Sequence, residues 1–211
     1  LREHINAIQT DESVSCVILR GAGKCFSAGH DLADISEGED TTSPFWHSET
    51  LRMMERLPKP VIAAVHGHCY TGALEVALAA DFILASSDVR FADTHAKWAL
   101  TPIWGMSQRL PRRVGIATAK RLMFSAATVK SEEARMIGLC ELVFPAETFF
   151  EQVDTFARSI LENSVFSHAA NKKLLDATDH RPLDAGLLWE VNENEGTGPD
   201  FQARIDAFLN K

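Results

Sequence analysis

A single carboxylate, Glu75, stands in the apolar stretch VIAAVHGHCYTGALEVALAAD, which covers residues 61 to 81. A β-type run at 61–65 leads into a glycine-containing turn, and an alanine-rich helix follows with Glu75 in its first turn. Backbone N–H groups at a helix start have no acceptor within the helix and point outward. A carboxylate beside such donors, among apolar residues, predicts chemistry on a carbonyl group. The alternative is an ordinary first-turn acid that stabilises the helix dipole.

Two similar turns are candidates for holding the oxygen of that carbonyl. The segments CVILRGAGKCFSAGHDL and VIAAVHGHCYTGALEVAL both have the pattern of a strand, a turn of small residues and a helix. Each turn places a backbone N–H near its last small residue, at His30 and at Gly72. Two such donors directed at one point would form an oxyanion hole, which stabilises charge that develops on a carbonyl oxygen. Spacing alone fits two ordinary glycine turns as well.

A second candidate for acid–base chemistry is His95, in the dense segment FADTHAKWALTPIWGMSQRLPRRVG at 91–115. An imidazole titrates near neutral pH and can therefore act as an acid or as a base. The alternative is a structural histidine that a hydrogen bond satisfies.

Two other motifs do not carry a function. GAGK at 21–24 lacks the spacing of a phosphate-binding loop, and no Ser or Thr follows Lys24. His66 and His68, taken with His95, suggest zinc, but no further cysteine or carboxylate follows at ligand spacing. We therefore expect no metal site.

The composition describes an acidic globular protein. The chain of 211 residues carries a net charge of −8, which argues against nucleic acid as the main partner because duplex binding needs a basic face. A local basic pocket for a phosphorylated ligand stays open, because five basic residues cluster in the sequence: Arg109, Arg112, Arg113, Lys120 and Arg121.

Cysteine usage and the chain ends bear on the compartment. Cys16, Cys25, Cys69 and Cys140 are irregularly spaced, which is typical of reduced residues in an intracellular protein. No run approaches the roughly 18 apolar residues of a membrane helix, and we expect no signal peptide. Because the chain opens with Leu1 in a helical pattern, we expect that part of the natural N-terminus precedes it.

The coarse pattern is that of an α/β protein with mostly parallel strands. Buried strands are expected at 16–20, 61–65, 82–86 and 139–145, and a polar loop at 33–44. Helices are expected at 1–9, 45–57, 72–80 and 131–138, with two more in 105–125 that break near Pro111 and Gly115. From residue 147 onward the pattern is almost wholly helical.

Five segments in order resemble the crotonase superfamily, the enoyl-CoA hydratase/isomerase family. They are FSAGHDL, VIAAVHGHCYTGALEVALAADFILAS, FADTHAKWALTPIWGMSQRLPRRVG, SEEARMIGLCELVFP and PDFQARIDAFLNK. The resemblance implies a spiral of ββα units in residues 1–145, with the N-terminal hairpin missing, and a helical trimerisation region in residues 146–211. It also implies a homotrimer or a dimer of trimers that binds acyl-CoA thioesters.

The resemblance assigns roles to particular positions. It implies that the thioester oxygen lies between the amides of His30 and Gly72, and that Glu75 is the first of two catalytic glutamates. The second glutamate lies twenty residues further on, where this chain has His95. Substrate contacts are implied or expected at Ala28, Leu32, Trp104, Phe208 and Lys211, the last two from a neighbouring subunit.

The resulting prediction is an enoyl-CoA hydratase that adds water to a 2-enoyl-CoA through a stabilised enolate. Because His95 replaces the second acid, three other reactions of the thioester stay open: hydrolysis, decarboxylation and isomerisation. Binding of a CoA ester without catalysis is a further alternative. We expect no cofactor beyond the coenzyme A of the substrate and no membrane partner. The expected compartment is the cytoplasm, or a mitochondrion or peroxisome in a eukaryote.

Overall fold

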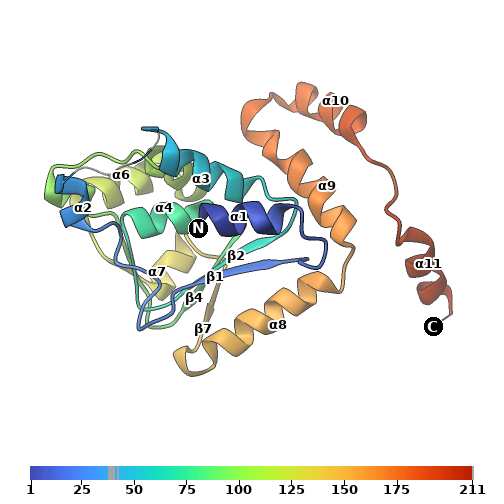
Figure 1. Ribbon diagram of the computed structural model, residues 1–211, viewed down its shortest axis with the longest axis horizontal. Coiled ribbons are helices and arrows are strands. Elements are labelled where there is room, and N and C mark those ends of the chain that lie inside the picture. Colours follow the sequence, from blue (N-terminus) through green and yellow to red (C-terminus); the bar gives the residue numbers. More distant parts are fainter. Residues whose placement is uncertain (38–40, 42, 211) are drawn as a thin grey trace.

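A four-stranded parallel sheet forms the centre of the protein in this computed structural model (Figure 1). The structure describes residues 1–37, 41 and 43–210. The strands lie in the order β1-β2-β4-β7, and all neighbouring pairs are parallel. Their bounds are Val17–Arg20 for β1, Val61–Val65 for β2, Phe82–Ser86 for β4 and Leu142–Phe144 for β7.

The strand β2 shows why this sheet lies inside the molecule. Its five residues, VIAAV, are all fully buried, as expected for a central parallel strand with apolar side chains on both faces. Successive side chains point to opposite faces. Val61, Ala63 and Val65 join the larger core cluster, whereas Ile62 and Ala64 pack in a smaller cluster. That smaller cluster includes Phe149 and Val153 of the helix α8, Phe149–Leu161.

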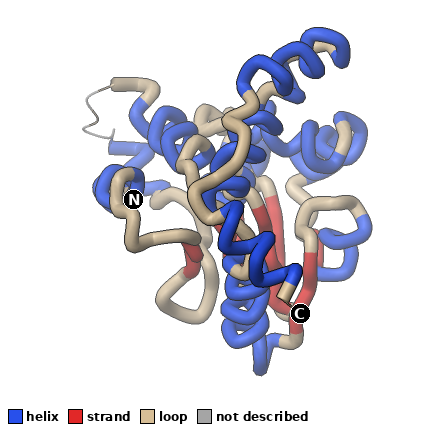
Figure 2. The backbone as a smooth tube through the Cα atoms, turned by 90° about the vertical axis from the view of Figure 1, so that its right-hand side faces the viewer, coloured by secondary structure: helices blue, strands red, loops and turns tan. Residues whose placement is uncertain are grey.

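Helices enclose this sheet on both faces (Figures 1 and 2). On one side lie α1 (Arg2–Gln9), α3 (Trp46–Glu55) and α4 (Gly72–Leu78), and on the other lies α8 (Figure 1). The remaining helices of the body are α2 (Leu32–Glu37), α5 (Met106–Val114), α6 (Ile116–Ser125) and α7 (Ser131–Met136). No helix among the described residues has the length and apolar character to cross a membrane.

A second, smaller sheet connects the segments that carry the candidate site residues. It has the order β3-β5-β6, with bounds His68–Tyr70, Arg90–Ala92 and Val129–Lys130. The pair β3·β5 is parallel and the pair β5·β6 antiparallel. Because β3 leads into Gly72 and β5 leads into His95, this pairing brings two distant parts of the sequence to one place.

The last three helices extend from the body of the molecule (Figure 1). They are α9 (Val165–Asp176), α10 (Leu183–Glu193) and α11 (Phe201–Leu209). Several of their large apolar side chains are exposed, including Leu183, Leu188, Val191 and Phe208. The division of the chain at residue 145 stays a prediction.

The expected α/β architecture is confirmed, with local corrections. A short helix, α2, occupies part of the predicted loop at 33–44. The predicted break near Pro111 is wrong, because Pro111 lies inside α5 and the helix ends only before Gly115. A proline removes its own donor but keeps its acceptor, and the Pro111 carbonyl accepts from the Gly115 amide at 2.9 Å. Strands of two or three residues at 68–70, 90–92 and 129–130 were not predicted, because they are too short for a periodic pattern.

Candidate active site

Glu75 is buried at the start of α4, with only 2 % of its surface exposed. Its Oε1 accepts hydrogen bonds from the backbone amides of Trp104, at 3.0 Å, and Met106, at 2.9 Å. Burial raises the pKa of the Glu75 carboxyl above its ordinary value, although the Met106 amide, the charge of His95 and the Trp104 amide each lower it. The carboxyl is therefore fixed in one orientation and is a better base than an exposed glutamate.

The turn before α4 holds a strained residue. Thr71 has a φ of +54°, which is an outlier for a β-branched side chain and costs about 1–3 kcal/mol. Its amide donates to the Ala92 carbonyl at 2.8 Å, and its hydroxyl lies 2.5 Å from that of Thr94. These bonds tie the β3–α4 turn to the end of β5. They fix the position of Gly72, the first helical residue, whose N–H has no acceptor within the helix.

His95 lies opposite Glu75, on the short 3-10 helix η1, His95–Trp98. Its Nε2 is 4.0 Å from Glu75 Oε2, and its Nδ1 is 2.6 Å from Asp93 Oδ1. Burial lowers the pKa of the His95 imidazole, but the hydrogen bond and charge of Asp93 and the charge of Glu75 outweigh it, so the net change raises the pKa. The structure thus brings together the two residues that the sequence singled out for acid–base chemistry.

The turn that contains His30 packs directly against the turn that contains Gly72. Ser27 bridges to Cys69 in parallel register, and the Tyr70 amide donates to the Ser27 carbonyl at 3.3 Å. Gly29 has a φ of +108°, and a Cβ at this position would lie 2.8 Å from the Tyr70 carbonyl oxygen. Only glycine therefore allows this close approach. His30 and Gly72 consequently line the same cavities, as two donors to one oxygen require.

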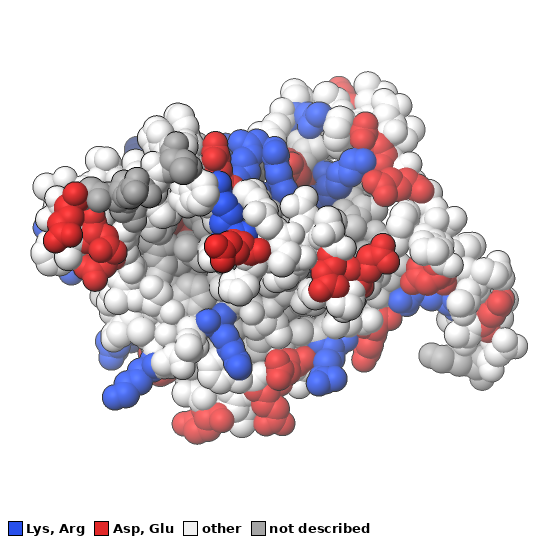
Figure 3. Space-filling view, in the orientation of Figure 1, with Lys and Arg blue, Asp and Glu red and all other residues white. Residues whose placement is uncertain are grey.

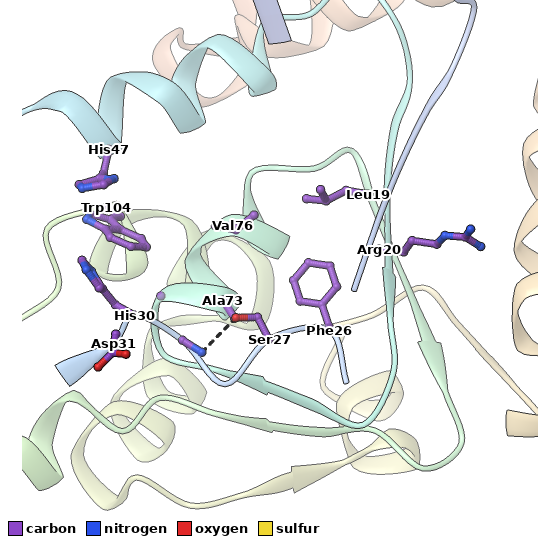
Figure 4. A pocket seen from close by; sticks show the side chains of 12 residues that line it. Leu19, Arg20, Phe26, Ser27, His30, Asp31, His47, Ala73, Val76 and Trp104 are labelled. Carbon is purple, nitrogen blue, oxygen red and sulfur yellow. Dashed lines mark hydrogen bonds between the residues drawn. The ribbon is translucent and has the colours of Figure 1, made fainter. Parts of the chain in front are cut away.

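Three rings stack beside these turns, with Trp104 between His47 of α3 and His30 (Figure 4). The ring centroids of His47 and Trp104 are 4.6 Å apart, and those of His30 and Trp104 are 5.2 Å apart. The indole also covers Gly72, since a Cβ there would lie 2.7 Å from Trp104 Cζ3. His47 was missed in the sequence, where no spacing connects it to the other two rings.

Two adjoining cavities share this wall of rings. The smaller, of about 380 Å³, is lined by apolar residues that include Leu19, Phe26 and Val76 (Figure 4). The larger, of about 970 Å³, contains Glu75 and His95. The predicted contact residues Ala28, Leu32 and Trp104 all line the larger cavity.

Two predicted contact residues do not lie at either cavity in this chain. Phe208 on α11 is 73 % exposed and is absent from both linings, so its contact with substrate stays a prediction. Lys211 lies outside the described residues.

The basic cluster of the sequence lies outside the two cavities described above. None of its five residues lines either of them. Three of them pair with glutamates: Arg109 with Glu55, Arg113 with Glu141 and Arg121 with Glu133. Figure 3 shows basic and acidic side chains interspersed over one face, with acidic residues gathered near α2. Among the described residues, no group of three or more His, Cys, Asp or Glu side chains is arranged to hold a metal ion.

Comparison with known proteins decides the family. The model of the enoyl-CoA hydratase/isomerase family matches residues 1–211. The chain belongs to this family. Among solved structures, the enoyl-CoA hydratase of Bacillus anthracis superposes with a TM-score of 0.93 at 30 % identity, over 99 % of this chain and 83 % of that one. The crotonase fold expected from the sequence is therefore confirmed.

Two relatives of this enoyl-CoA hydratase/isomerase family protein share about a third of its sequence. The short-chain-enoyl-CoA hydratase of Clostridium acetobutylicum is 34 % identical over 98 % of this chain and 82 % of its own length. The crotonyl-CoA hydratase of Syntrophomonas wolfei is 34 % identical over 91 % of this chain and 75 % of its own length.

Proposed function

We propose that this family member is a hydratase that adds water to short-chain 2-enoyl-CoA thioesters. Two relatives that are 34 % identical carry the names short-chain-enoyl-CoA hydratase and crotonyl-CoA hydratase. The observation that carries the proposal is the facing pair in the larger cavity, where Glu75 Oε2 and His95 Nε2 are 4.0 Å apart. At this spacing the carboxylate and the imidazole can both reach the water and the double bond of one bound substrate.

The thioester oxygen would lie between the amides of His30 and Gly72. Both residues line the boundary that the two cavities share. Two fixed donors stabilise the enolate oxygen that forms when water adds to the β-carbon. The acyl group would then extend into the larger cavity, toward Glu75 and His95, and the pantetheine would run past Ala28 and Leu32.

Glu75 would remove a proton from the water that attacks the β-carbon. Its raised pKa makes the carboxylate a stronger base, and the Trp104 and Met106 amides hold it in place. His95 would deliver a proton to the α-carbon. The reaction needs no group beyond the thioester, whose carbonyl accepts the electron pair of the double bond.

A spectroscopic assay tests the proposal. Purified protein mixed with crotonyl-CoA should remove the conjugated enoyl absorbance, and mass spectrometry should show a product heavier by one water. Glu75→Gln should abolish the change, whereas Glu151→Gln should not, because Glu151 is exposed on α8 at the opposite face. Release of free CoA thiol would favour hydrolysis, and release of carbon dioxide would favour decarboxylation. Binding without turnover of any CoA ester would contradict the enzyme proposal.

Isomerisation is the second candidate. The observation that favours it is His95 at the place of the second glutamate, because one imidazole can take a proton from one carbon and return it to another. A 3-enoyl-CoA would then gain conjugated absorbance with no change in mass. That result, with no hydration of crotonyl-CoA, would replace the hydratase proposal.

The assembly proposed here is a homotrimer or a dimer of trimers formed through residues 146–211. The exposed apolar side chains of α10 and α11 support it, because groups of exposed apolar residues mark sites of association with other proteins. Phe208 would then meet the CoA of a neighbouring subunit. The compartment we propose is the cytoplasm, where thiols such as the four free cysteines of this chain stay reduced.

A further inference from the structure

We propose that Asp93 is a positioning residue that keeps one proton on His95 Nδ1, so that the exchangeable proton of this imidazole is always at Nε2. The inference rests on the proposed hydratase function and deepens it. At the position where the family has its second glutamate, the proton donor would be Nε2 of His95, in a ring whose Nδ1 proton Asp93 holds.

The contacts of Asp93 support this role. Its Oδ1 accepts from His95 Nδ1 at 2.6 Å and from the His95 backbone amide at 3.2 Å. A carboxylate can only accept, so the ring nitrogen that faces it must carry the proton. The other nitrogen, Nε2, is then the atom that gains and loses a proton, and it is the one that faces Glu75 Oε2.

Burial of the Asp93 carboxylate destabilises the folded protein unless a partner compensates its charge. Only 1 % of the residue is exposed, and its Oδ2 is buried with no hydrogen-bond partner among the described residues. An unsatisfied buried carboxylate oxygen destabilises a fold. A positive imidazolium beside it offsets part of that cost, so Asp93 and protonated His95 stabilise each other.

Other charged groups lie near His95, and Glu75 adds to the effect of Asp93 by raising the pKa of the imidazole further. Glu75 faces it from α4, and Lys97 lies on the same 3-10 helix. Asp31, His30 and His47 also line the cavity. The helix α6, which packs against η1, carries Lys120, which is exposed, and Arg121, which pairs with Glu133.

The proton balance of hydration follows from this arrangement. Before reaction, Glu75 is a carboxylate and His95 is an imidazolium. A proton passes from water to Glu75 as the water oxygen bonds to the β-carbon, and the electron pair of the double bond moves to the thioester enolate. The enolate α-carbon then takes the Nε2 proton. Return of the proton from Glu75 Oε2 to His95 Nε2 restores both groups, and the net change is the addition of one water.

The decisive variant is Asp93→Asn. An amide can turn its NH₂ toward Nδ1, which would move the neutral-ring proton to Nε2 and remove the charge that favours the imidazolium. We expect kcat for crotonyl-CoA to fall about 100-fold. Activity that needs protonated His95 is lost as pH rises through its pKa, so the alkaline limb of the kcat profile should move to lower pH. Asp88→Asn is the matched control, because Asp88 is an exposed acid in the turn between β4 and β5.

A readout independent of activity is the NMR spectrum of the protein with isotope-labelled histidine, with His95 assigned by difference from His95→Gln. We expect Nδ1 to stay protonated at every pH in the wild type, and the pKa of His95 to fall in Asp93→Asn but not in Asp88→Asn. An unchanged tautomer and pKa in a folded Asp93→Asn variant would overturn the inference. A wild type that shows the expected spectrum but hydrates no enoyl-CoA would support the role of Asp93 and contradict the hydratase proposal.

Discussion

The two walls of the larger cavity are built differently. The α4 wall carries Glu75 in a helix whose residues Gly72–Glu75 are all buried, and backbone amides orient the carboxyl. The η1 wall carries His95 on a 3-10 helix with no buried residue, next to the exposed Trp98 and Ile103. Backbone amides therefore orient the proposed base, Glu75, whereas a side chain, Asp93, orients the proposed acid, His95. Substitutions on the two walls should differ accordingly.

The largest difference should appear in catalysis. We expect Glu75→Gln to lower kcat about 10,000-fold, because Glu75 is the one buried carboxylate among the described residues that line this cavity. His95→Gln should lower it about 100-fold, since water can reach the half-exposed wall and deliver a proton. Initial rates with crotonyl-CoA measure both effects. Equal losses of kcat in the two variants would contradict the proposed difference between the two walls.

The next largest difference between the two walls should appear in the free energy of unfolding of their variants. Leu74→Ala removes a side chain that is 1 % exposed and should lower the free energy of unfolding by about 2–5 kcal/mol. Trp98→Ala, at 55 % exposure on the η1 wall, should change it by about 0.5 kcal/mol or less. Denaturant titrations followed by circular dichroism give both values. A large loss in Trp98→Ala would mean that the η1 wall packs more tightly than its exposure indicates.

Selectivity should depend on the ring stack that joins the walls. Trp104→Ala keeps the backbone amide that holds Glu75 but removes the indole over Gly72. We expect kcat/KM for crotonyl-CoA to fall about 10-fold and the relative rate with bulkier acyl groups to rise. A panel of 2-enoyl-CoA esters of increasing size measures this. An unchanged order of preference would show that the indole does not limit the acyl group.

The smallest effect concerns pH and stability. The pKa of His95 is raised in the folded protein, so its contribution to stability is complete below its unfolded pKa and is lost as pH rises through the folded value. Between those values the wild type should lose stability relative to His95→Gln. Melting temperatures of both proteins across that range give the difference. A difference that does not depend on pH would contradict the raised pKa.

The difference between the two walls also explains which features the sequence could predict. The strands at 61–65 and 82–86 and the helix at Glu75 have strong apolar patterns, so they were predicted near their observed bounds. Family motifs placed His30, Gly72 and Glu75 near one another. The role of Asp93 was not predicted, because a hydrogen bond between two side chains two residues apart leaves no periodic signal.

The other features that the sequence did not predict depend on contacts between residues far apart in the chain. His47 reaches Trp104 from a helix more than fifty residues earlier, and only the assembled fold shows that the rings stack. The short strands β3, β5 and β6 exist because they pair with one another, not because of their own sequence. The strain at Thr71 was not predicted, since its positive φ depends on the bonds to Ala92 and Thr94.

The most direct test of the central claim is a double-mutant cycle on kcat with crotonyl-CoA, using Glu75→Gln, His95→Gln and the double variant. When two residues act on the same water and the same enolate, the effects of substituting them on the activation free energy do not add. We predict that the double variant is about as slow as Glu75→Gln alone. Effects that simply multiply, or a Glu75→Gln variant that still hydrates crotonyl-CoA at the wild-type rate, would contradict the account.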